Sequence, residues 1–275
     1  IRAYFSYKKK IDVLIKKDFR IENIPVRYYR GKNKSKSEVL PIMIYFHGGG
    51  WVLGNTDTHD QVCSILVNKG KYDLISVEYS LAPEAIFPKA INESKKILKS
   101  ISKNKYGLRI NNNKIILCGD SAGGNIATVL ANYSKNVLKA NVIFQVLIYP
   151  ATHMFSKYDS KNKYEGLILN KKLMKWFEDH YCPNKIRKKY FDDPRLSPIK
   201  NKKMKDMPDT LIVLAECDPL YDEGLLYGKK LKKNNVKVEI KVYKGLMHGF
   251  LTMGGVIKEV SSVLAFINKK INNYL

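Results

Sequence analysis

The chain contains 275 residues, of which 45% are hydrophobic, and carries a formal net charge of +24. This length allows one large α/β domain with a buried core, and the hydrophobic content does not fit a disordered chain. The sequence lacks an uninterrupted apolar run long enough to span a membrane, so we expect no stable membrane insertion.

Basic residues are spread along the whole chain rather than gathered in one patch. Lysine accounts for 42 of them and arginine for 7, whereas phosphate recognition favours arginine and local clusters. The densest stretch, residues 185–205, contains nine basic residues and is interpreted as a solvated surface segment. We therefore predict no nucleic-acid partner.

The N-terminal part of the chain differs from the rest. Residues 1–17 precede the first strand-like segment and are interpreted as a short remnant of an N-terminal cap. Residues 18–31 show polar alternation around a turn at Asn23, which predicts an antiparallel hairpin at one edge of a sheet. The main domain is predicted to span residues 18–275.

After this hairpin, the chain alternates between short apolar runs and helix-like stretches. The apolar runs, which we predict to be strands, are residues 39–46, 72–79, 114–119, 141–150, 209–216 and 236–243. The helix-like stretches are residues 58–70, 88–103, 121–134, 222–234 and 255–270. Near-continuous hydrophobicity is typical of strands covered on both faces, so the pattern predicts an α/β fold with a mostly parallel central sheet wrapped by helices. The functional residues of such sheets lie beyond the carboxyl ends of the strands.

One long connection breaks the alternation. Residues 152–208 are basic and rich in aromatic side chains, and they contain no clear strand. A connection of this length inside a compact domain usually carries function or covers a site. We interpret it as a small helical cap, or lid, inserted in the main domain.

A short motif indicates a nucleophile. Residues 119–123 have the pattern G-x-S-x-G and lie between an apparent strand and an apparent helix. A serine on such a sharp turn projects its hydroxyl out of the sheet, and the flanking glycines avoid collision with neighbouring backbone. Ser121 is therefore the candidate nucleophile, although the pentapeptide alone also fits a tight turn with an inert serine.

A serine hydroxyl needs a base to take its proton, and the base needs a carboxylate to fix its tautomer. His248 comes after the last apolar run, where a loop before the final helix places it at the carboxyl edge of the sheet. Asp218 directly follows another strand, whereas Asp222 is better placed as the N-cap of the next helix. We therefore predict a catalytic triad of Ser121, Asp218 and His248. The histidines interpreted as packed or surface residues are His59, His153 and His180.

Three consecutive glycines, residues 48–50, follow an early strand. Attack on an ester carbonyl creates an oxyanion, and backbone N–H groups can converge on it where no side chain intervenes. The glycine loop supplies such donors, joined by the amide of Ala122. His47, which precedes the glycines, is interpreted as an anchor of this loop.

Four separated segments resemble the hormone-sensitive-lipase-like branch of the α/β-hydrolase fold, which contains acetyl esterases and carboxylesterases. They are HGGGW at residues 47–51, YSLAPEAIFPKA at 79–90, GDSAGG at 119–124, and DPLYDEG at 218–224 together with HGF at 248–250. The segments occur in the family's order, and so do the serine, aspartate and histidine of the predicted triad. The resemblance covers the chain from about residue 18 to its end.

The resemblance implies an α/β-hydrolase catalytic domain and an oxyanion hole formed by Gly49, Gly50 and Ala122. It further implies a serine hydrolase that cleaves carboxylic esters of short to medium acyl chains through an acyl-enzyme, without a metal or organic cofactor. Two positions depart from the family pattern. Ser80 replaces the usual arginine and Glu78 replaces a common aspartate, which puts a local salt bridge in doubt but not the chemistry.

Two other functions fit the same residues. An amidase or formamidase would use the same triad, because nothing in the sequence separates amide from ester leaving groups. A non-catalytic binding protein on a hydrolase scaffold is a third reading, although such proteins usually lack a member of the triad.

The expected partner is a small-molecule ester substrate. By analogy with the family, two copies of the chain could pair as a homodimer through the edge strand at residues 236–243. The four cysteines are scattered without CxxC spacing, which favours free thiols in a reducing compartment and hence a cytoplasmic protein.

Overall fold

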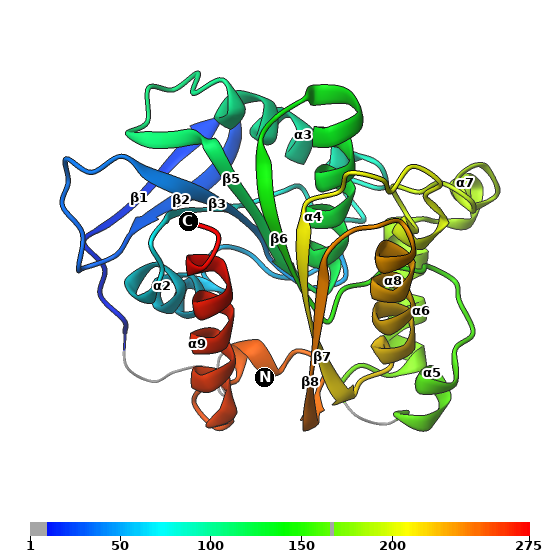
Figure 1. Ribbon diagram of the computed structural model, residues 1–275. Helices are drawn as coiled ribbons and strands as arrows, with labels where there is room; N and C mark the ends of the chain where they lie inside the picture. Colours follow the sequence, from blue (N-terminus) through cyan, green and yellow to red (C-terminus); the bar gives the residue numbers. More distant parts are fainter. Residues whose placement is uncertain (1–9, 166–167) are drawn as a thin grey trace.

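The computed structural model describes residues 10–165 and 168–275. Its strands are β1 (Ile15–Ile21), β2 (Ile24–Arg30), β3 (Leu40–Phe46), β4 (Asp73–Val77), β5 (Ile110–Asp120), β6 (Val142–Ile148), β7 (Asp209–Cys217) and β8 (Val238–Met247). Within the described ranges these strands form one sheet in the order β1-β2-β4-β3-β5-β6-β7-β8 (Figure 1). The β1–β2 and β2–β4 pairs are antiparallel and the other pairs are parallel. The predicted mostly parallel sheet with antiparallel N-terminal edge strands is confirmed.

The N-terminal hairpin turns where the sequence indicates. Glu22 and Asn23 connect β1 to β2, and both have positive φ angles, 51° and 65°. Two such residues match the twist of a two-residue hairpin turn, and asparagine tolerates this conformation well. The first strand begins at Ile15 rather than at residue 18, because its pairing with β2 extends to Arg30. Residues 1–9 of the predicted cap remnant lie outside the described part of the chain.

Helices cover both faces of the sheet. The helices that do so are α2 (Asp60–Lys69), α3 (Lys89–Ser102), α4 (Ala122–Tyr133), α8 (Tyr221–Lys233) and α9 (Glu259–Asn272). Buried residues of α3, α4 and α8 belong to one hydrophobic cluster, and those of α2 and α9 belong to a second. Figure 1 shows α8 and α9 on opposite sides of β7 and β8.

Strand β3 shows how the sequence fills both clusters. Successive side chains of a strand point to opposite faces of the sheet. Ile42, Ile44 and Phe46 accordingly pack in the first cluster, whereas Met43 and Tyr45 pack in the second. All five side chains are buried, which explains why this strand appears in the sequence as a continuous apolar run.

The long connection at residues 152–208 contains helices and, among its described residues, no strand. Its helices are α5 (Asp159–Lys163), α6 (Lys171–Tyr181), α7 (Asn184–Tyr190) and the short 3₁₀ helix η2 (Pro198–Lys200). The side chain of Asn170 caps α6 by accepting a hydrogen bond from the N–H of Leu173 at 2.8 Å. At the other end of α6, the rings of Tyr181 and Trp51 stack with centroids 4.5 Å apart. The segment is thereby packed against the glycine-containing loop after β3.

None of the helices in the described ranges combines the length and the apolar character needed to cross a membrane.

Candidate active site

Ser121 occupies the sharp turn between β5 and α4. Its φ of 55° and ψ of −118° are unusual for a residue other than glycine, and such strain clusters at functional sites. Its N–H donates to the carbonyl of Ile148 at 2.9 Å, and its own carbonyl accepts from the N–H of Ala151 at 3.1 Å. A Cβ atom at Gly123 would overlap the carbonyl of Phe46, so the second glycine of the motif is required by space. The turn has the geometry that the G-x-S-x-G pattern predicts.

The side chains of Ser121, His248 and Asp218 form a hydrogen-bonded chain. Ser121 Oγ lies 2.9 Å from His248 Nε2, and His248 Nδ1 lies 2.8 Å from Asp218 Oδ2. Because a carboxylate only accepts, Nδ1 carries the proton and donates it to Asp218, which leaves Nε2 to accept from the serine hydroxyl. The other oxygen of Asp218 accepts from the N–H of Leu220 at 2.8 Å, so the carboxylate is held in place.

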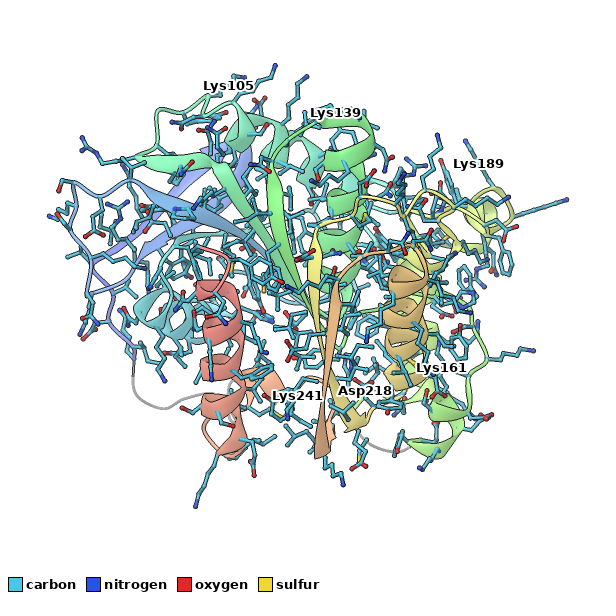
Figure 2. The ribbon with its side chains drawn as sticks, viewed as in Figure 1. Lys105, Lys139, Lys161, Lys189, Asp218 and Lys241 are labelled. Carbon is cyan, nitrogen blue, oxygen red and sulfur yellow. The ribbon has the colours of Figure 1, made fainter. Side chains whose placement is uncertain are left out.

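The parallel pairing of β7 and β8 brings the aspartate and the histidine together. Asp218 immediately follows β7, His248 immediately follows β8, and the two strands end at the same edge of the sheet. Figure 2 shows Asp218 at the lower end of β7. Both side chains are buried. The predicted loop between residue 243 and His248 is wrong, because β8 continues to Met247 and pairs there with Cys217 across a register shift.

Asp222 is not the N-cap of the following helix, contrary to the prediction. Helix α8 begins at Tyr221 with Leu220 as its N-cap, and Asp222 lies in the first turn. Its Oδ2 atom accepts a hydrogen bond from the N–H of Ser160 at 2.8 Å. The carboxylate therefore ties α8 to the distant helix α5 instead of capping its own helix.

The glycine loop lies beside the serine. Gly49 has a φ of 128° and Gly50 a φ of 62°, conformations that residues with side chains rarely adopt. The carbonyl of Gly49 accepts from the N–H of Leu53 at 2.8 Å, which closes the loop into a tight turn. Both glycines line the same cavity as Ser121. Ala122 is the first residue of α4, where a backbone N–H has no partner within the helix.

Asp120 connects the glycine loop to the nucleophile turn, a role that the sequence analysis missed. Its Oδ1 atom accepts from the N–H of Gly48 at 2.9 Å and from the hydroxyl of Tyr45 at 2.9 Å. His59 Nε2 lies 3.1 Å from the same oxygen, and the ring of His59 is buried. A signal was available in the sequence, because Asp120 is the second residue of the G-x-S-x-G motif itself.

His47 lies under the glycine loop. Its Nδ1 atom is 2.9 Å from the carbonyl oxygen of Gly48, and its ring stacks on that of Tyr79 with centroids 4.3 Å apart. The hydroxyl of Tyr79 donates to the His47 carbonyl at 2.7 Å. This arrangement is that of an anchor.

The two remaining histidines belong to the helical connection. His153 Nδ1 lies 2.7 Å from the hydroxyl oxygen of Tyr158, and His153 lines the cavity. His180 donates from Nδ1 to the carbonyl of Trp176 within its own helix at 2.7 Å.

The two positions that depart from the family pattern are hydrogen-bonded in another way. Ser80 donates its hydroxyl to Glu93 Oε1 at 2.8 Å, and its N–H donates to the other oxygen of the same carboxylate at 2.8 Å. Glu78 accepts from the N–H of Thr56 at 2.8 Å. Both polar groups are therefore satisfied without the salt bridge.

Ser121 and His248 open into a cavity of about 490 Å³. Much of its wall comes from the helical connection, including the apolar residues Leu169, Leu173, Met174, Phe177 and Leu196. Its polar wall residues include His153, Lys161, Glu178 and Glu223.

Among the described residues, no group of three or more histidine, cysteine, aspartate or glutamate side chains is arranged to hold a metal ion.

Comparison with known proteins identifies the family. The family model described as the alpha/beta hydrolase fold matches residues 43–252, which is more than half of the chain. The chain therefore belongs to the α/β-hydrolase family, and the resemblance read from its motifs is confirmed.

Several of the similar proteins are named as ester hydrolases. The ethyl acetate hydrolase of Pseudomonas putida is 32% identical over 255 residues, covering 92% of this chain and 79% of the relative. The carboxylesterase NlhH of Mycobacterium tuberculosis is 32% identical over 238 residues, covering 86% of this chain and 74% of the relative. Among solved structures, an esterase of Pyrobaculum calidifontis shares 36% identity and a TM-score of 0.89, with 95% of this chain and 86% of that chain covered.

Proposed function

We propose that the protein is a serine carboxylesterase that hydrolyses esters of short to medium acyl chains. The observation that carries this proposal is the relay of 2.9 Å and 2.8 Å from Ser121 through His248 to Asp218, which opens into a cavity beside a glycine loop. The names of the relatives, an ethyl acetate hydrolase and a carboxylesterase, support an ester as the substrate class.

In the first half of the reaction, Ser121 Oγ attacks the ester carbonyl carbon and its proton passes to His248 Nε2. The Asp218 carboxylate stabilises the resulting imidazolium through Nδ1–H. The negative charge on the former carbonyl oxygen is held by backbone N–H groups of Gly49, Gly50 and Ala122. The carbon–oxygen bond to the alcohol then breaks, and His248 gives its proton to the leaving alcohol.

In the second half, a water molecule hydrolyses the acyl-enzyme. His248 Nε2 takes a proton from the water as its oxygen attacks the acyl carbon, and the same backbone N–H groups stabilise the new oxyanion. When the bond to Ser121 Oγ breaks, His248 returns the proton to the serine. The products are a carboxylic acid and a free enzyme, and no redox step occurs.

The helical connection at residues 152–208 is proposed to act as the cap of this site within a catalytic domain that spans residues 18–275. The ring of Phe177, on α6, packs so closely against Gly50 that a Cβ atom there would overlap it. The apolar residues of the connection line the cavity and are suited to the hydrocarbon part of an ester. The cap thereby shields the reacting bond from bulk water.

The decisive experiment removes the nucleophile. Ser121→Ala is expected to lower kcat for p-nitrophenyl acetate and butyrate by about 10⁴-fold or more. Ser262→Ala, which changes an exposed serine on α9, serves as the matched control and should retain activity. A fluorophosphonate should add one adduct to the wild-type chain on the peptide that contains Ser121. Undiminished hydrolysis by Ser121→Ala rejects the proposal, and faster turnover of a matched amide would assign the site to an amidase.

Two predictions about the whole protein accompany this proposal. Strand β8 lies at an edge of the sheet, which supports pairing of two copies through it; native mass spectrometry tests the homodimer. The four cysteines are free and three of them are buried, which supports a cytoplasmic, reducing location.

A further inference from the structure

One end of the cavity carries charged groups that the proposed reaction does not use. Lys161, Glu178 and Glu223 line the cavity together with Ser121 and His248. We call these three residues the polar end. Among the lysines of the described ranges, Lys161 is the one that is buried, with 11% of its side chain exposed. Because a charged side chain is rarely buried without a purpose or a partner, the surroundings of Lys161 are informative.

Within residues 10–165 and 168–275, the ammonium group of Lys161 has two polar partners. Lys161 Nζ donates to Ser156 Oγ at 2.8 Å and lies 3.2 Å from Glu223 Oε2. The other oxygen of Glu223 accepts from the N–H groups of Thr152 at 2.7 Å and His153 at 3.0 Å. Glu223 is therefore locked into the protein, whereas the ammonium group of Lys161 has three N–H donors for the two partners that the described residues provide.

Glu178 adds a carboxyl group to the polar end. It reaches the cavity from α6, and its Oε1 atom accepts from the N–H of Phe155 at 3.1 Å. Burial raises the pKa of Glu178, which the nearby charge of Lys161 only partly opposes. Lys161 and Glu223 offset each other in charge, and the three side chains make the polar end rich in hydrogen-bonding groups.

Hydrogen bonds connect the polar end to the turn that carries Asp218 of the serine relay. The hydroxyl of Ser160, the residue before Lys161, donates to the carbonyl of Pro219 at 2.8 Å, and its N–H donates to Asp222 at 2.8 Å. These contacts join α5 to the turn that contains Asp218. Figure 2 shows Lys161 and Asp218 at the same end of the molecule.

These groups restrict what the cavity can bind well. An apolar chain that covered them would leave their hydrogen-bonding capacity unused, which is unfavourable in a buried site. A carboxylate on the substrate would face two glutamates, and an ammonium group would face Lys161. A hydroxyl group is neutral, accepts a hydrogen bond from Lys161 and can donate one to Glu178.

We propose that the polar end formed by Lys161, Glu178 and Glu223 recognises a hydroxyl group on the substrate, so that the preferred substrates are hydroxylated esters. This inference rests on the proposed esterase function and adds the substrate class. Lys161 is then a specificity residue that contacts a part of the ester away from the reacting bond.

Matched pairs of esters test the proposal on both sides of the ester bond. Ethyl 3-hydroxybutyrate and ethyl butyrate differ by a hydroxyl in the acyl part, and 4-hydroxybutyl acetate and butyl acetate differ by one in the alcohol. We expect the wild type to favour the hydroxylated member of at least one pair in kcat/KM by about tenfold, measured by acid release. Lys161→Met should reduce this preference about tenfold, whereas Lys163→Met, an exposed lysine on the same helix, should keep it.

The outcomes distinguish failure of the hydroxyl proposal from failure of the esterase function. A wild type that hydrolyses both members of both pairs equally well overturns the hydroxyl proposal but leaves the esterase function intact. An unchanged preference in Lys161→Met also overturns it; if that variant does not fold, Glu178→Leu provides the same test from α6. Absence of hydrolysis of every ester, together with no fluorophosphonate adduct on Ser121, rejects the esterase function and with it this inference.

Discussion

The carboxyl ends of the strands and the helical connection at residues 152–208 contribute to one cavity in different ways. At the carboxyl ends of the strands, the residues of the proposed triad are held by backbone: Ser121 by its turn, and Asp218 and His248 by the ends of two paired strands. In the connection, side chains from short helices form the wall. Under the proposed function, the reaction is carried out by the part that strand pairing fixes, and the substrate is selected by the part that side-chain packing forms.

Substitutions at the carboxyl ends of the strands should therefore affect kcat most. Asp218→Asn preserves the size of the side chain but replaces the carboxylate with an amide. An amide N–H facing His248 Nδ1 favours the tautomer that carries its proton on Nε2. In that tautomer, Nε2 cannot accept the proton of Ser121. We expect kcat for p-nitrophenyl acetate to fall by about 10⁴-fold with a small change in KM. Asp192→Asn, at an exposed aspartate in the connection, is the control and should retain its activity. Comparable activity of both variants would falsify the assignment of Asp218.

The strand and helix pattern was largely predictable because it depends on local signals. The predicted runs correspond to β3 through β8 and to the five helices that cover the sheet, since buried strands and amphipathic helices differ in period and are separated by turn residues. The end of β8 was not predictable in this way. A glycine at position 245 is typical of a turn in the sequence, and Gly245 has a φ of 69°. The strand nevertheless continues past it to Met247 through a shifted register.

The residues around the candidate site divide in the same manner. Ser121, Asp218 and His248 could be selected because each directly follows a strand, and parallel strands end at a common edge. His59 could not, because its position beside Asp120 depends on a contact between residues far apart in the sequence. Lys161 is one of 42 lysines, and only the tertiary packing of α5 against α8 distinguishes it from the exposed ones.

A smaller effect is expected where the glycine loop meets the nucleophile turn. Asp120→Asn keeps an oxygen that can accept from the N–H of Gly48 but removes the negative charge beside His59. Charge-assisted hydrogen bonds are stronger than neutral ones, so the loop becomes less firmly positioned for the oxyanion. We expect kcat to fall about tenfold with little change in KM. Steady-state kinetics on p-nitrophenyl butyrate measure kcat and KM separately, and a change confined to KM would assign Asp120 to substrate binding instead.

The smallest effect on kcat is expected in the connection. Phe177 lines the cavity and packs on Gly50, so Phe177→Ala enlarges the space for the acyl chain without touching the serine relay. We expect kcat/KM for acetate esters to fall a few-fold, about the effect of losing apolar contact, while longer acyl chains gain relative to acetate. A series of p-nitrophenyl esters from acetate to octanoate measures this shift. Ile186→Ala, on the neighbouring helix α7, is the control and should leave the chain-length profile unchanged, because that residue is not part of the cavity wall. A uniform loss across the series would instead mean that Phe177 supports the glycine loop, and the division between chemistry and substrate choice would not hold at this contact.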